Sequence, residues 1–115
     1  MQFEGICTPI VTPYHDDFSL NEPALAQTVE HLIVAGVHGI VVAGSTGEYY
    51  AQTPEERLEM MTRCAALING RVPMIVGTGA IRTEDSVMYA KAAKAAGADA
   101  LLVATPPYAY PTGRE

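Results

Sequence analysis

Basic residues are scarce in this sequence: seven lysines and arginines stand against thirteen aspartates and glutamates, and the formal net charge is −6. Proteins that bind nucleic acids usually carry a basic patch or stripe that neutralises backbone phosphates. No such cluster of lysine and arginine occurs along the chain. The sequence therefore argues against a nucleic-acid partner.

Long hydrophobic runs are missing as well. No apolar stretch approaches the length that a membrane-spanning helix needs. The first six residues contain no basic region followed by a long apolar one, which a secretory signal would show. We therefore expect no membrane partner and no export, and hence a cytoplasmic location.

Cysteine is almost absent, and the two cysteines, Cys7 and Cys64, fall on different predicted elements. Two isolated cysteines fit buried free thiols in a reducing cytoplasm better than a disulfide. A disulfide would require that the fold brings the two side chains together, which the sequence alone does not decide.

Apolar residues make up 49% of the 115 residues, which is typical of a globular protein and not of a disordered one. A chain of this length fits one small domain or part of a larger one. His15, Asp16 and Asp17 form a polar segment that we expect to be a solvated loop. Three adjacent positions cannot all face one metal ion from regular structure, so no metal site is expected there.

The most informative stretch is residues 39–50, an apolar run that stops at two hydroxyl side chains between glycines. Residues 40–43 are typical of a strand buried on both faces, as in a parallel sheet. Ser45 and Thr46 follow at its carboxyl end, where parallel α/β sheets bind ligands. Gly44 and Gly47 lack Cβ, so the backbone can turn sharply and a ligand can approach its N–H groups. The pattern fits equally well an ordinary turn in which the two hydroxyls bond their own backbone.

Apolar segments alternate with amphipathic ones along the chain. Strands are predicted at residues 39–43, 73–77 and 99–104, and within 5–13, where prolines predict an irregular strand that ends near Pro9. Helices are predicted after the N-caps Asn21, Thr53 and Thr83, with stops at Gly36, at 69–70 and at Gly97. The second helix is expected to bury Leu58, Met61, Ala65 and Ile68.

The strands recur at roughly thirty-residue spacing, which is the length of one βα unit. Right-handed crossovers then give an α/β fold with a parallel sheet and helices outside it. Four apolar strands in an open sheet would leave two unprotected edges. We therefore expect parallel βα units forming the first half of a (β/α)8 TIM barrel, with residues 1–115 as a single partial domain that holds strands one to four and helices one to three. A doubly wound open sheet is the alternative, although the Gly-x-Gly-x-x-Gly fingerprint is missing after the first strand.

Several motifs occur together in a fixed order. They are Thr8-Pro9 in the first strand, Gly-Ser-Thr-Gly-Glu at 44–48, Thr-Pro-Glu-Glu-Arg at 53–57 and Thr-Pro-Pro-Tyr at 105–108. Together they resemble the dihydrodipicolinate synthase and N-acetylneuraminate lyase family, class I aldolase-type lyases and synthases that bind pyruvate as a Schiff base. The resemblance spans the whole chain. It implies a TIM barrel, a cytoplasmic homo-oligomer built as a dimer of dimers, and no cofactor or metal.

The resemblance also implies roles for single residues. Thr46 would bind the pyruvate carboxylate through its hydroxyl and backbone N–H, between Gly44 and Gly47. Ser45 would relay protons between tyrosines, and Tyr108 would reach the neighbouring site across a dimer interface. Turn chemistry for Ser45 and an interface anchor for Tyr108 are the alternatives.

The family's Schiff-base lysine lies at the end of the sixth strand, beyond the segments found here. The only lysines, Lys91 and Lys94, fall on the third predicted helix, where solvated surface charge is expected. A lysine nucleophile needs a desolvated pocket, so neither is expected to form the imine. We therefore expect these residues to be the amino-terminal portion of a longer enzyme and to be inactive alone.

The partner substrate, an aldehyde-type small molecule, is not fixed by the sequence. Ser45-Thr46 is more typical of the lyase branch, and Pro107 and Ala109 beside Tyr108 depart from the synthase pattern, so a sugar-acid aldolase such as one acting on 2-keto-3-deoxy acids or N-acetylneuraminate stays open. A second hypothesis is a non-catalytic half-barrel that assembles with itself or with a partner chain. A third is phosphate binding at residues 77–79.

Overall fold

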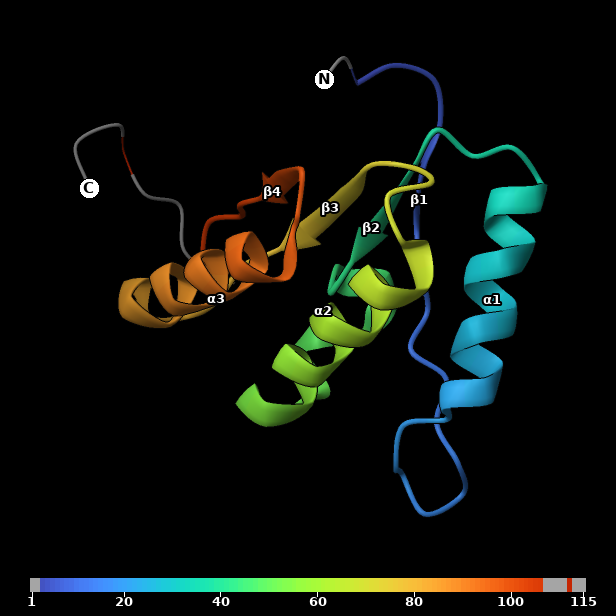
Figure 1. Ribbon diagram of the computed structural model, residues 1–115. Coiled ribbons are helices and arrows are strands. Elements are labelled where there is room, and N and C mark those ends of the chain that lie inside the picture. The colour runs from blue at the N-terminus through green and yellow to red at the C-terminus, as the bar shows by residue number, and fades with distance from the viewer. Residues whose placement is uncertain (1–2, 107–111, 113–115) are drawn as a thin grey trace.

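The structure, a computed structural model, describes residues 3–106 and 112. In this part of the chain, four strands alternate with three helices (Figure 1). The strands are β1 (Cys7–Pro9), β2 (Gly39–Val42), β3 (Met74–Gly77) and β4 (Ala100–Leu102). The helices are α1 (Glu22–Val34), α2 (Pro54–Ile68) and α3 (Thr83–Ala96), and two short 3-10 turns, η1 (Ser45–Gly47) and η2 (Tyr49–Ala51), follow β2.

The sheet is parallel throughout, and its strands lie side by side in the order of the sequence. Each connection from one strand to the next passes through a helix, and Figure 1 shows α1, α2 and α3 side by side along the sheet. Consecutive parallel strands joined by helices are the arrangement of the first half of a (β/α)8 barrel. The predicted fold class is therefore confirmed, and the doubly wound alternative is not needed.

The helix boundaries follow the predicted caps with one exception. Asn21 Oδ1 accepts a 3.1 Å hydrogen bond from Ala24 N at the start of α1. Thr53 and Glu56 form a complete capping box at the start of α2. At α3 the predicted N-cap is wrong by one residue, because Arg82 is extended and Thr83 is already helical. The Arg82 side chain makes no cap hydrogen bond, so α3 begins without a side-chain cap.

The core lies between the sheet and the helices. Alternate residues of β2 and β3 point into it, namely Ile40, Val42, Met74 and Val76. From the helices it receives Leu25, Val29, Met60, Met61, Cys64, Ile68, Tyr89 and Ala93. In α2 the buried stripe thus differs from the predicted one, since Leu58 and Ala65 are only half-buried.

The fourth strand is shorter than predicted. Residues 99–104 were predicted to form the strand, but β4 covers only Ala100–Leu102, and Leu102 is 50% exposed. Within the described residues β4 pairs with β3 alone. It is an edge strand, so one side of its backbone and much of its apolar surface have no partner from this part of the chain.

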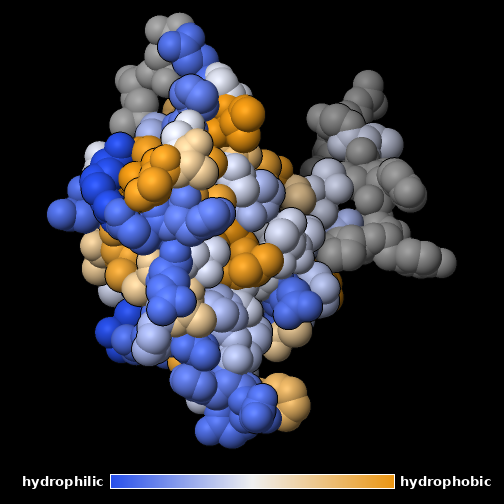
Figure 2. Space-filling view, turned by 90° about the vertical axis from the view of Figure 1, so that its right-hand side faces the viewer, coloured by the Kyte–Doolittle hydropathy of each residue, from blue (hydrophilic) through white to orange (hydrophobic). Residues whose placement is uncertain are grey.

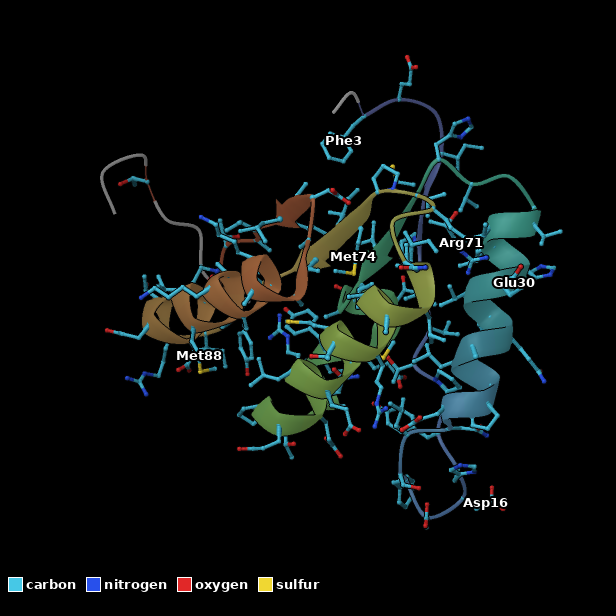
Figure 3. The ribbon with its side chains drawn as sticks, viewed as in Figure 1. Phe3, Asp16, Glu30, Arg71, Met74 and Met88 are labelled. Carbon is cyan, nitrogen blue, oxygen red and sulfur yellow. The ribbon has the colours of Figure 1, made fainter. Side chains whose placement is uncertain are left out.

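The helix layer faces outward with polar side chains. Figure 2 shows the side that carries α1, where hydrophilic residues dominate and hydrophobic residues form small separate patches. Arg71, just after α2, reaches Glu30 of α1 at 2.7 Å, and Figure 3 shows the two side chains meeting. Asp16 lies at the tip of the loop before α1, away from the sheet, as expected of a solvated loop (Figure 3). Exposed ion pairs of this kind contribute about 0–1 kcal/mol, so burial and not charge holds the helices to the sheet.

Both cysteines are free thiols, as predicted. Cys64 is fully buried, and burial raises the pKa of its thiol to about 12. Cys7 is only half-buried, which corrects the expectation that both would be enclosed. Among the described residues, no helix combines the length and apolarity that crossing a membrane demands.

Candidate functional site

The candidate site begins where β2 ends. Ala43 is buried and has a φ of 55°, so the chain leaves the strand through a left-handed residue. Ser45 and Thr46 then open the 3-10 turn η1, and both are exposed. Backbone bonds from Gly47 N to Gly44 O and from Glu48 N to Ser45 O, each 3.0 Å, close the turn. Two hydroxyl side chains are thus presented on a short, bonded turn directly after a fully buried strand.

The two glycines of this turn act differently from the prediction. The φ of Gly44 is −83°, and an added Cβ there would meet only Val41 Cγ1 at 3.6 Å, so neither turning nor space requires glycine. The left-handed residues are Ala43 and Glu48 instead. Gly47 favours a close approach, because an added Cβ would lie 3.0 Å from Ile10 O, a tight contact. It lets the turn rest on the chain that leaves β1.

A buried polar network fixes the carbonyl of Gly47. Thr12 Oγ1 donates to it at 2.7 Å, and Gln52 Nε2 lies 3.4 Å away. The same Gln52 nitrogen donates to Thr12 Oγ1 at 3.2 Å and to the Tyr14 hydroxyl at 3.1 Å. On the other side of this network is a cavity of about 180 Å³, lined among others by Thr12, Tyr14 and Gln52. The network holds the turn from behind and leaves Ser45 and Thr46 free to face outward.

The end of β3 lies against the end of β2. An added Cβ on Gly77 would come within 2.2 Å of Ala43 O, so only glycine permits this approach. Thr78 is fully buried, and its N–H donates to Leu102 O at 3.0 Å. The carbonyls of Gly77 and Gly79 accept hydrogen bonds from Arg57 of α2. Several backbone groups of residues 77–79 are therefore engaged within the protein, whereas the buried Thr78 hydroxyl has no hydrogen-bond partner in the described structure.

Of the predicted site residues, the structure brings four together: Gly44, Ser45, Thr46 and Gly47 lie in one turn. Tyr108 lies outside the described residues. Lys91 and Lys94 are exposed on α3, as predicted. No set of three or more His, Cys, Asp or Glu side chains within the described part of the chain is grouped so as to hold a metal ion.

Three residues that support the site were missed at the level of sequence: Thr12, Gln52 and Arg57. Thr12 and Gln52 contact Gly47 across 35 and 5 residues of sequence, and no local pattern marks such contacts. The sequence did hold a signal for the burial of Arg57, because position 57 lies on the same helix face as the buried Met61, Cys64 and Ile68. Arginine is almost never fully buried unless paired, which hid that signal.

The chain is similar to known proteins over almost its whole length. The model of the Dihydrodipicolinate synthetase family matches residues 2–115. A 4-hydroxy-tetrahydrodipicolinate synthase from Methanoculleus marisnigri is 42% identical over 111 residues, which are 95% of this chain. The chain spans 38% of the length of that relative.

Solved structures agree in fold as well. YagE, a prophage protein of the dihydrodipicolinic acid synthase family from E. coli K12, in complex with pyruvate, superposes with a TM-score of 0.93 at 32% identity. The match covers 97% of this chain and 38% of that one. A chloride-inhibited dihydrodipicolinate synthase from Acinetobacter baumannii, complexed with pyruvate, gives a TM-score of 0.92 at 38% identity, covering 96% and 38%.

Proposed function

Because the chain belongs to the dihydrodipicolinate synthetase family, we propose that it supplies the pyruvate-carboxylate subsite of a carbon–carbon lyase or synthase. The reaction is an aldol-type addition or cleavage in which pyruvate is held as a Schiff base. Two structural neighbours were solved with pyruvate bound, which supports pyruvate as the common substrate.

The observation that carries the proposal is the exposed Ser45–Thr46 pair at the carboxyl end of a buried parallel strand. In the described structure no backbone carbonyl accepts from the N–H of Ser45 or Thr46, so both donors are available beside the two hydroxyls. Neutral donors held in place bind a carboxylate through charge-assisted hydrogen bonds and need no rearrangement during the reaction. Thr46 would bind the carboxylate through its hydroxyl and N–H, with Gly44 and Gly47 on either side of the Ser45–Thr46 pair.

Proton transfer is assigned to Ser45 and Tyr108. A hydroxyl with a normal pKa moves protons only as a member of a hydrogen-bonded chain. Ser45 is adjacent to Thr46 and exposed on the same turn, so it can pass a proton next to the bound carboxylate. Tyr108 would complete that chain from a second copy of the protein, which makes the homo-oligomer, a dimer of dimers, part of the proposal.

The imine would form on a lysine outside these 115 residues. Lys91 and Lys94 are both exposed on α3, in the helix layer, whereas Thr46 follows a strand end. A lysine nucleophile needs a desolvated pocket, which neither of these exposed positions provides. Residues 1–115 would accordingly form one partial domain, inactive without the segment that carries the lysine, in a cytoplasmic enzyme.

The second substrate is an aldehyde-type molecule. The relative from Methanoculleus marisnigri bears the name 4-hydroxy-tetrahydrodipicolinate synthase, which favours a synthase activity over sugar-acid cleavage. The Ser45–Thr46 pair is the feature that keeps an aldolase acting on sugar acids as the alternative. Cleavage of 2-keto-3-deoxy acids or N-acetylneuraminate to pyruvate by the complete enzyme would favour the aldolase, and absence of this cleavage would favour the synthase.

The carboxylate subsite is tested by comparing the pyruvate affinity of Thr46→Ala with that of the wild type. Loss of one hydrogen bond to a charged group costs about 1.5–3 kcal/mol, so the dissociation constant should rise roughly 10- to 100-fold. Thr62→Ala is the matched control, because Thr62 is exposed on α2 and its hydroxyl only bonds Leu58 O at 3.0 Å. Calorimetric titration with equal pyruvate affinity in wild type and Thr46→Ala would remove Thr46 from the subsite.

A non-catalytic half-barrel that pairs with another chain is a second candidate. Exposed apolar side chains on and after β4 favour it, with Leu101, Leu102 and Val103 between 41% and 67% exposed. Light scattering on the 115-residue chain separates a defined dimer from an aggregate. Phosphate binding at residues 77–79 loses support, since Thr78 is buried and both flanking carbonyls bond Arg57.

A further inference from the structure

We propose that Arg57 is a positioning residue: its guanidinium joins the turn that carries Thr46 to the end of β3 and so fixes the shape of the candidate site. The structural half of this proposal stands on contacts within the chain. The functional half, that pyruvate binding depends on it, rests on the function proposed above.

The first set of contacts is to the loop after β3. Arg57 lies in the first turn of α2 and is only 3% exposed. Its Nη1 donates to Gly79 O at 2.9 Å and its Nη2 donates to Gly77 O at 2.8 Å. The two nitrogens of one planar fork therefore hold two carbonyls on either side of Thr78, a geometry that lysine cannot reproduce.

The second set of contacts is to two tyrosine rings. The guanidinium carbon lies 4.5 Å from the ring centroid of Tyr49 and 3.9 Å from that of Tyr89. Tyr49 opens η2, three residues after Thr46, and Tyr89 belongs to α3. One side chain of α2 thus contacts the turn after β2, the loop after β3 and the next helix. Cation–π contacts strengthen when the cation is removed from water.

Filling space in the core does not explain the buried charge of Arg57. In the described residues Arg57 has no carboxylate partner, and its Nε has no hydrogen-bond partner. Removal from water lowers the pKa of Arg57, which shows that burial disfavours the charge. An apolar side chain would fill the space without this cost. What an apolar side chain cannot do is bind two carbonyls and two ring faces at once.

The position of these contacts links them to Thr46. The backbone of Gly77 lies directly against Ala43, the left-handed residue that starts the turn. Arg57 therefore acts on the turn from both ends: through Gly77 onto Ala43 before Ser45, and through Tyr49 after Gly47. A shift of either end would move the hydroxyl and N–H groups of Thr46.

Amide hydrogen exchange tests the structural half. In Arg57→Met, the amides of Gly47, Glu48, Ala51, Gln52 and Thr78 should exchange at least about tenfold faster, while β1 and α1 keep their protection. Arg63→Met is the matched control, because Arg63 lies on the same helix, is half exposed and makes only surface ion pairs. Tyr49→Leu should speed exchange at residues 47–52 and leave Thr78 protected. If Arg57→Met does not fold, Arg57→Lys should show smaller increases in exchange rate at the same amides.

Unchanged exchange in both loops, or an increase spread evenly over the chain, would overturn the structural half. For the functional half, Arg57→Met should raise the pyruvate dissociation constant at least about tenfold. Arg57→Lys should raise this constant less, and Arg63→Met should leave it unchanged. Faster amide exchange in both loops together with wild-type pyruvate affinity would mean that Arg57 has only a structural role, and would refute the functional half. If wild type itself fails to bind pyruvate, the proposed function fails, and the exchange result still decides what Arg57 holds.

Discussion

Replacing Gly77 with alanine should disrupt the candidate site from the neighbouring strand. The new Cβ would lie 2.2 Å from Ala43 O and 2.9 Å from Ala43 C, and real Cβ contacts are not shorter than 3.0 Å. The atoms in the way are backbone, so no side chain can rotate aside. The ends of β2 and β3 would have to separate, and Ala43 already sits at a φ of 55°.

The expected cost can be bounded. Overpacking of a close-packed interior costs typically about 1–3 kcal/mol, and a backbone clash belongs at the upper end of that range. Alanine also lowers the conformational entropy of the unfolded chain, which stabilises the folded state by about 0.4–1 kcal/mol relative to glycine. We therefore expect Gly77→Ala to lower the free energy of unfolding by about 2 kcal/mol, and to weaken pyruvate binding because the turn after β2 moves.

Gly44→Ala is the matched control in the same loop pair. Its φ of −83° suits alanine, and the nearest atom to the added Cβ is Val41 Cγ1 at 3.6 Å. Its stability should equal or slightly exceed that of wild type. Urea denaturation of the three proteins gives the comparison. Equal stability of Gly77→Ala and Gly44→Ala would refute the close approach of the two strand ends.

Three further predictions follow from the site and the core. Ser45→Ala and Tyr108→Phe should mainly lower turnover and leave the KM for pyruvate nearly unchanged, because a relay matters in the transition state more than in binding; wild-type kcat in both variants would contradict the relay. Thr46→Ala should instead raise the pyruvate requirement, as measured by the KM in the same assay. Iodoacetamide at pH 8 should alkylate Cys7 in the folded protein and leave Cys64 unmodified, since the Cys64 thiol is enclosed and its pKa is raised to about 12; modification of both before unfolding would contradict that burial.

The fold was predictable from local signals. Each βα unit carries its own start and stop: the capping box at Thr53, the left-handed glycine at Gly36 and the apolar strand at residues 40–42. Local signals place elements well because they depend on neighbouring residues only. They failed at the length of β4, which covers only Ala100–Leu102 of the predicted residues 99–104.

The sequence predicted where the candidate site lies, at a strand end, but not which residues hold it in place. The strand end and its two hydroxyls are visible in the sequence at Ser45 and Thr46. The contacts that hold them come from Thr12, Gln52 and Arg57, which meet only in the folded chain. The role of Gly44 was misjudged for the same reason, since sequence shows where glycine stands and not which residue takes the positive φ.

We propose that this chain belongs to an enzyme that binds pyruvate as a Schiff base, with Thr46 at the pyruvate carboxylate. Borohydride trapping with pyruvate, on the protein as isolated from its natural source, tests it most directly. Intact mass spectrometry followed by peptide mapping reads the result. A reduced pyruvate adduct is expected on a lysine other than Lys91 and Lys94, formed less efficiently in Thr46→Ala. Absence of any adduct, or an adduct on either of those two lysines, would contradict it.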